Sequence, residues 1–140
     1  MLFQADITIP ANTTEASPTI VKMGISKGVI TKFMIRPRPG HAGLAHCRIY
    51  YHESPIAPTT LGMDLHGDAD PIDWEDNIEV LQSPLYLEIR GWNTDDTYEH
   101  TFTIYIVILP KEILLVNAIV GAIAGVFRGI FPTRLPGGNK

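Results

Sequence analysis

The sequence predicts an all-β fold, a β-sandwich of the jelly-roll type, followed by a C-terminal apolar α-helix. Apolar and polar residues alternate with a period of two in several short runs before Pro110, the pattern of strands with one buried face. Turn-forming residues separate these runs at short intervals, as in sandwiches and jelly rolls. No helical period occurs before Pro110, whereas residues 113–127 are apolar almost without interruption.

Length and composition are those of a globular protein with a single core. The chain has 140 residues, of which 45% are hydrophobic. The formal net charge of −4 offers no basic surface, so direct nucleic acid binding is not expected. The N-terminal residues contain no basic segment followed by an apolar one, so we predict synthesis in the cytoplasm without a signal peptide.

Four strands are expected in the first part of the chain, at residues 3–9, 19–23, 29–36 and 44–52. The third carries bulky residues on both faces, which is typical of a central strand. The fourth contains Cys47, the single cysteine, which excludes an intrachain disulfide and is expected to be buried. From residue 53 to residue 84 the pattern is weak, and only residues 77–81 are predicted to form a strand there. Loops and contacts with partners are expected in this region.

Residues 85–109 carry the clearest strand pattern. Two long alternating runs flank the polar segment 93–97, whose side chains favour turns. We therefore predict that the two runs form an antiparallel hairpin. The expected core comes from the strands of clearest pattern: Phe33, Ile35, Cys47, Ile49, Leu87, Ile89, Ile104 and Ile106.

No motif predicts an enzyme or a cofactor. The chain lacks a nucleophile elbow, a phosphate-binding glycine loop and a dinucleotide fingerprint. Its five histidines show no spacing that is typical of a metal site, although His46 and His52 could share a strand face, so no metal is predicted. The acidic residues between positions 64 and 76 do not match the calcium loop of an EF-hand. An alternative ligand contact is assigned to Trp74, Trp92, Asp68 and Asp70, against the simpler interpretation that the tryptophans pack in the core.

The C-terminal segment gives the strongest functional signal. Small residues recur on one side of the predicted helix, and we assign them to an oligomer interface: Asn117, Ala118, Gly121, Ala122, Gly125 and Gly129. Each interior glycine costs a helix about 1 kcal/mol, which close contact with another backbone can offset. A membrane anchor is the second interpretation, but fifteen apolar residues span only about 22 Å of a hydrocarbon core about 30 Å thick.

Residues 90–101 resemble a family of small β-rich proteins encoded by tailed phages. Residues 9–13, 28–30, 39–44 and 58–59 also carry this resemblance, which covers most of residues 1–110. It implies a structural role in the virion. The glycine-striped C-terminal segment departs from the family pattern.

The sequence thus leads to one principal hypothesis and one alternative. The principal hypothesis is a virion structural protein, such as a small capsid, decoration or connector component, that forms homo-oligomers and contacts other virion proteins. It contains a β-sandwich domain at residues 1–110, an apolar helix at 111–131 and a flexible tail at 132–140. The alternative is a tail-anchored β-sandwich that binds a carbohydrate or calcium and contacts a membrane through the helix.

Overall fold

The computed structural model describes residues 1–130, with side chains described as far as residue 126. The chain divides into two compact units, Met1–Leu109 and Pro110–Lys140. The predicted tail at residues 132–140 lies outside the described residues. The first unit contains these strands: β1 (Leu2–Ile9), β2 (Thr19–Gly24), β3 (Gly28–Pro37), β4 (Ala45–Tyr51), β5 (Ser54–Ala57), β6 (Leu65–His66), β7 (Ile72–Val80), β8 (Tyr86–Asn93) and β9 (His100–Leu109). The second contains the helix α1 (Lys111–Ile130).

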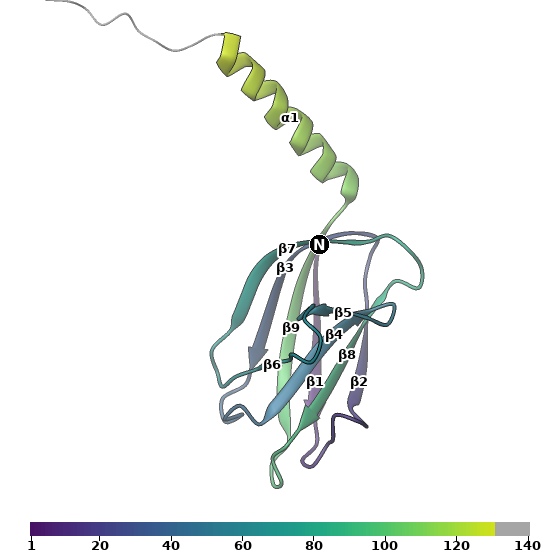
Figure 1. Cartoon of the computed structure of the whole chain (residues 1–140), viewed down its shortest axis with the longest axis vertical. Helices are drawn as coiled ribbons and strands as arrows, with labels where there is room; N and C mark the ends of the chain where they lie inside the picture. The colour runs from purple at the N-terminus through teal and green to yellow at the C-terminus, as the bar shows by residue number, and fades with distance from the viewer. Residues whose placement is uncertain (131–140) are drawn as a thin grey trace, which may run out of the picture. The chain divides into compact units, whose positions relative to one another are not determined.

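The strands form two antiparallel sheets, which confirms the predicted all-β class (Figure 1). Sheet A has the order β1-β9-β3-β7 and sheet B has the order β2-β8-β4-β5, while the short strand β6 also pairs with β4. The predicted central position of residues 29–36 is confirmed, because β3 lies between β9 and β7. Residues 2–109, all of which are described, contain no α-helix.

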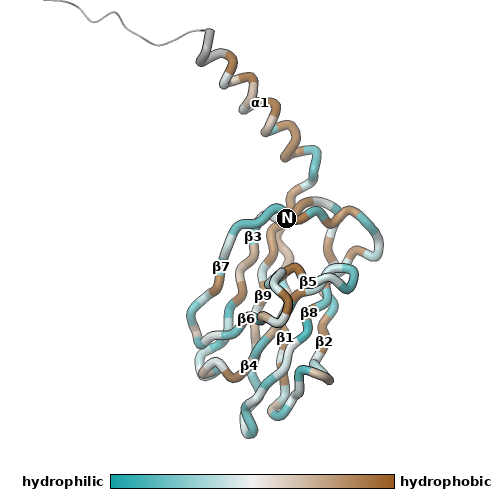
Figure 2. The backbone as a smooth tube through the Cα atoms, in the orientation of Figure 1, coloured by the Kyte–Doolittle hydropathy of each residue, from teal (hydrophilic) through white to brown (hydrophobic). Residues whose placement is uncertain are grey.

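One hydrophobic core receives side chains from both sheets. All eight predicted core residues are fully buried, each with 0% of its surface exposed: Phe33, Ile35, Cys47, Ile49, Leu87, Ile89, Ile104 and Ile106. Burial also raises the pKa of the Cys47 thiol, so this cysteine stays protonated in the core. The alternation of hydropathy along the strands, visible in Figure 2, therefore identified the inner face of each sheet correctly.

The predicted hairpin of residues 85–109 is wrong. Strand β8 pairs with β2 and β4 in sheet B, whereas β9 pairs with β1 and β3 in sheet A. The polar segment between them therefore crosses from one sheet to the other. Both strands bury their apolar faces in the same core from opposite sides, which satisfies the alternating pattern as well as a hairpin does.

The weakly patterned region contains more structure than predicted. Strand β7 is longer than the predicted strand at residues 77–81, and β5 and β6 were not predicted. Strand β5 includes Pro55, and β6 has only two residues, so neither has a periodic pattern long enough to recognise. Strand β7 forms the edge of sheet A beside β3, and five of its nine residues are polar or charged and exposed.

Two glycines are required by close approaches between strands. A side chain at Gly28 would collide with the backbone oxygen of Leu109, and one at Gly91 would collide with Ile9 in the core. In both places a glycine lets two strands pack more closely than any other residue would allow.

Candidate functional site

The outer face of sheet B carries aromatic and charged side chains that contact one another. It is formed by alternate residues of β2, β8 and β4, because their neighbours in sequence point into the core. The strand register brings Trp92 opposite His46 and Arg90 opposite Arg48. Both pairs join β8 to β4 in the middle of the sheet.

Two arginines organise this face. Arg48 lies over the ring of Trp92, 4.9 Å from its centroid, and pairs with Glu15 at 2.9 Å. Arg90 lies 4.0 Å from the centroid of Tyr50 and pairs with the carboxylate of Glu88 at 2.5 Å. Hydrogen bonding to Glu88 is the main cause that raises the pKa of Arg90. Each guanidinium is thus held between an aromatic ring and a carboxylate, so the face has little unbalanced charge.

Two shallow pockets adjoin this face and share Glu15 and Trp92. The first has a volume of about 280 Å³ and is lined by Glu15, Ala16, Pro18, Ile20, Arg48, Tyr50, Arg90 and Trp92. The second has a volume of about 450 Å³ and is lined by residues 12–15 and 92–94. Within the described residues, the first combines charged and apolar groups in one concavity, which are the components of a small polar ligand site.

A histidine and aspartate cluster lies at the β4–β6 side of the same sheet. His46 in β4 and His66 in β6 are register partners, and Asp64 comes two residues before His66. One carboxylate oxygen of Asp64, Oδ1, accepts a hydrogen bond from Nδ1 of each histidine, both at 2.7 Å. Partial burial raises the pKa of Asp64, but the hydrogen bonds from the two histidines outweigh this effect and lower it overall. In the described part of the chain, this is the one set of three His, Cys, Asp or Glu side chains with converging ligand atoms.

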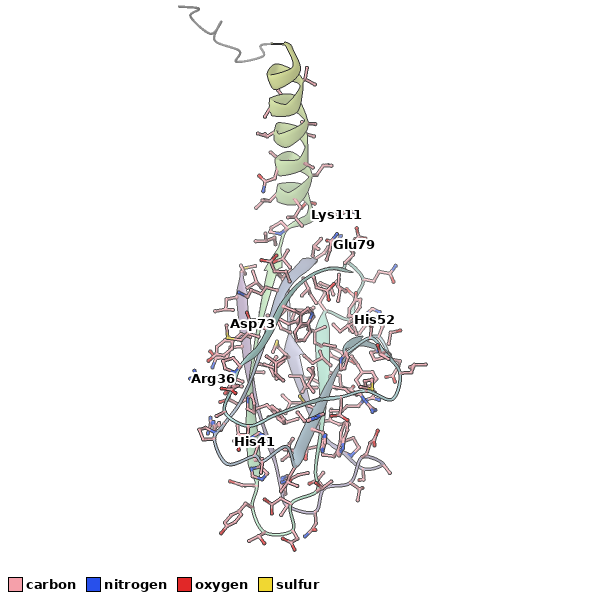
Figure 3. All side chains as sticks on the ribbon, turned by 60° about the vertical axis from the view of Figure 1, so that its left-hand side comes forward. Arg36, His41, His52, Asp73, Glu79 and Lys111 are labelled. Carbon is pink, nitrogen blue, oxygen red and sulfur yellow. The ribbon has the colours of Figure 1, made fainter. Side chains whose placement is uncertain are left out.

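A second histidine pair is formed by His41, in the loop that precedes β4, and His100, at the start of β9. His41, which is labelled in Figure 3, is 1% exposed, and its ring centroid is 4.7 Å from that of His100. Nε2 of His41 donates to the backbone oxygen of Thr101 at 2.9 Å, which leaves Nδ1 without a proton. Among the described residues, Nδ1 of His41 is the one buried side-chain nitrogen or oxygen that has no hydrogen-bond partner.

We expect this buried imidazole to make the protein less stable in acid. Burial is the main cause that lowers the pKa of His41 below its ordinary value of 6.5, and the nearby charge of His100 adds to it, opposed by Thr101 and Asp68. The unfolded chain therefore binds this proton more readily than the folded one. Above pH 6.5 His41 should not lower the free energy of unfolding. This free energy should decrease as the pH falls from 6.5 through the lower pKa of His41 in the folded state.

Urea unfolding on either side of pH 6.5 checks this expectation. His41→Gln keeps an amide donor for Thr101 but cannot titrate, so its stability should change less with pH than that of the wild type. His52→Asn, at an exposed position with φ of 46°, is the matched control and should keep the wild-type dependence. An unchanged dependence in His41→Gln would assign the effect to another group.

The structure does not bring the predicted ligand residues together. Trp74 lies in β7 of sheet A, where it stacks on Phe33 with ring centroids 4.8 Å apart, whereas Trp92 lies in sheet B. The two line different pockets. Asp68 accepts a hydrogen bond from the backbone N–H of Gly40 at 2.8 Å, and both Asp68 and Asp70 are exposed in the β6–β7 loop.

The predicted interface residues all lie in α1. Gly129 is in the last turn, beyond the described side chains, and the others are exposed. Gly121 and Gly125 have open space around them: an added Cβ atom would meet no described atom within 4 Å. No helix among the described residues has the length and apolar character needed to span a membrane.

Sequence reasoning missed the cluster of His46, Asp64 and His66. His46 is 18 residues from Asp64 in the sequence, and it meets Asp64 and His66 because β6 pairs with β4. The available signal was the Asp-X-His spacing of residues 64–66 inside a region otherwise read as loop. Compared as a whole, the sequence matches no known protein family and no curated protein.

Proposed function

We propose that the protein is a structural component of a virus particle in which copies of the chain associate through α1. The observation that carries the proposal is the surface of this helix. Seven large apolar side chains between Ile113 and Val126 are each 49–62% exposed, and at about 100° per residue they lie on one side of the helix, opposite the small residues. Figure 2 shows the apolar character along this helix. Residues 113–126 include no charged residue, so the helix has no charged face for solvent and is stable only when another surface covers it.

The occupant we assign to this surface is α1 of a second copy of the chain. Gly121 and Gly125 each cost the helix about 1 kcal/mol relative to alanine. Nothing in the described part of the chain requires them, because a Cβ atom at either position would meet no described atom within 4 Å. A neighbouring helix that packs closely against them accounts for their presence, and the amide of Asn117, on the same stripe, would then need a partner across the contact.

The strand order supports the virion assignment. Sheets β1-β9-β3-β7 and β2-β8-β4-β5 place successive strands mostly in alternate sheets, the order of an eight-stranded jelly roll with β6 as an addition. We therefore propose the jelly-roll form of the β-sandwich. This architecture recurs in viral capsid proteins and also in lectins and cupins, so it supports a capsid-type role by analogy only.

Replacing Gly125 with leucine is expected to abolish or strongly reduce self-association. Leucine raises helix propensity by about 1 kcal/mol but blocks the approach of a second helix. The two effects have opposite signs, so a helix without a helical partner should tolerate the change or gain helicity. Mass photometry of the wild type and of Gly121→Leu, Gly125→Leu and a chain truncated after Pro110 measures the difference.

Val126→Leu is the matched control, because it enlarges an exposed apolar side chain next to Gly125 without filling the glycine stripe. It should assemble as the wild type does. If all variants assemble alike, α1 does not organise the oligomer, and a sheet edge or the membrane anchor takes its place.

The virion role has its own test. Mass spectrometry and negative-stain imaging of purified particles should find the protein in a fixed ratio to the other virion proteins. Recovery of the protein in host membrane fractions alone would contradict the proposal and favour the tail-anchored alternative.

The alternative of carbohydrate or calcium binding has less support. Trp92 is 7% exposed and its ring is covered by His46 and Arg48, so it offers no open ring face to a sugar. Trp74 stacks on Phe33, which takes up one of its two ring faces. Calcium prefers several carboxylates, and among the described residues Asp68 and Asp70 do not belong to a set of converging ligands.

A further inference from the structure

His46, Asp64 and His66 form a constellation that the proposed role in assembly does not use. Their ligand atoms all lie within 4.8 Å of one another. The side chains of His46 and Asp64 are each 20% exposed, and that of His66 is 55% exposed. The cluster is therefore held against the sheet on one side and open to solvent at His66 on the other.

We propose that these three residues bind a divalent transition metal of the zinc class and thereby fasten β6 to β4. Imidazole is a borderline ligand that suits zinc and its neighbours, and zinc also accepts a carboxylate oxygen, whereas calcium takes six to eight oxygens. Three protein ligands leave a fourth position for water.

To accept the ion, the ligand atoms must move from separations of up to 4.8 Å to those of a tetrahedral site, and His66, whose side chain is 55% exposed, is the ligand with room to move. Zinc bonds of about 2.0–2.1 Å place tetrahedral ligands about 3.3 Å apart, or about 0.6 Å more than a hydrogen bond of 2.7 Å. The metal would replace the two protons that the histidines now share with Asp64. Rotation of the half-exposed His66 side chain can supply the extra distance without moving β4.

Neighbouring side chains hold the less exposed ligands in place. The ring of Trp92 stacks on His46 with an interplanar angle of 8°. Nε of Arg48 donates to the backbone oxygen of Met63, directly before Asp64. The charge of Arg48 is balanced by Glu15 at 2.9 Å, so this cation does not oppose a metal in the way that an unpaired one would. Supports of this kind orient ligands in established metal sites.

Isothermal titration of the full chain with Zn²⁺ tests the proposal. We expect one zinc per chain and a rise in the melting temperature when zinc is bound. His66→Ala and Asp64→Asn should each weaken binding by about tenfold or more and remove the thermal shift. Ca²⁺ in excess should not compete.

His52→Asn is the matched control, since it removes another exposed histidine of sheet B that lies outside the cluster and should bind zinc as the wild type does. Circular dichroism without metal shows whether each variant keeps the wild-type fold. The absence of a 1:1 site in the wild type would overturn the proposal. So would binding that His66→Ala and Asp64→Asn leave unchanged, or that His52→Asn weakens as much as they do. None of these outcomes depends on whether α1 associates.

Discussion

Replacing Ile104 with alanine is expected to lower the free energy of unfolding by about 2–5 kcal/mol. Ile104 is fully buried in β9, the strand that links β1 to β3, and its register partners are Ala5 and Ile35. The substitution removes three carbon atoms from the centre of the core, and strands held on both sides cannot close the resulting cavity completely. Urea unfolding monitored by tryptophan fluorescence measures the loss.

Val107→Ala is the control for this experiment. Val107 lies in the same strand but on the opposite face and is partly exposed. Its truncation should cost about 1 kcal/mol or less. A loss below about 0.5 kcal/mol for Ile104→Ala, the range of surface substitutions, would show that the inner face of β9 is assigned wrongly.

The second large effect is expected at Asn93, which is 1% exposed at the end of β8. Its amide nitrogen donates to the backbone oxygens of Ile9 and Tyr98, and its side-chain oxygen accepts from the backbone N–H of Asp95 at 2.9 Å. Asn93→Leu has a similar volume but leaves three backbone groups without their partner. At about 1–3 kcal/mol for each unsatisfied buried group, partly relieved by water, the expected loss is about 3 kcal/mol.

Thr94→Ala is the matched control, because the adjacent exposed residue loses one side-chain hydrogen bond, to the backbone oxygen of Leu44. Its expected cost is about 1 kcal/mol. Equal stabilities of Asn93→Leu and the wild type would mean that water replaces the amide completely. The comparison therefore measures how much Asn93 adds to the free energy of unfolding by joining the strand ends of the two sheets.

The sequence allowed the buried face of each long strand to be predicted, but not its partners. Alternation reports that Leu87 and Ile104 face a core, and both do. It carries no information about whether the strand on the other side of a polar segment lies in the same sheet. The crossing between β8 and β9 depends on the packing of two layers, which no local pattern records.

The candidate metal cluster was hidden for a related reason. His46 and His52 were considered as companions because the two share a strand parity. The residue that meets His46 is His66, in a strand of two residues. Such a strand exists through its pairing with β4 and has no periodicity of its own, so its register could be known only from the fold.

The position of β8 and β9 also sets the order in which the protein can fold during its synthesis. In the described structure β1 pairs with β9 and β2 pairs with β8, so Leu2 meets Val107 across almost the whole β domain. The first two strands therefore leave the ribosome long before their partners exist. Until then their edges are unprotected and prone to pair with other chains. Such distant contacts form slowly, and folding of the β domain must wait until β9 has been synthesised.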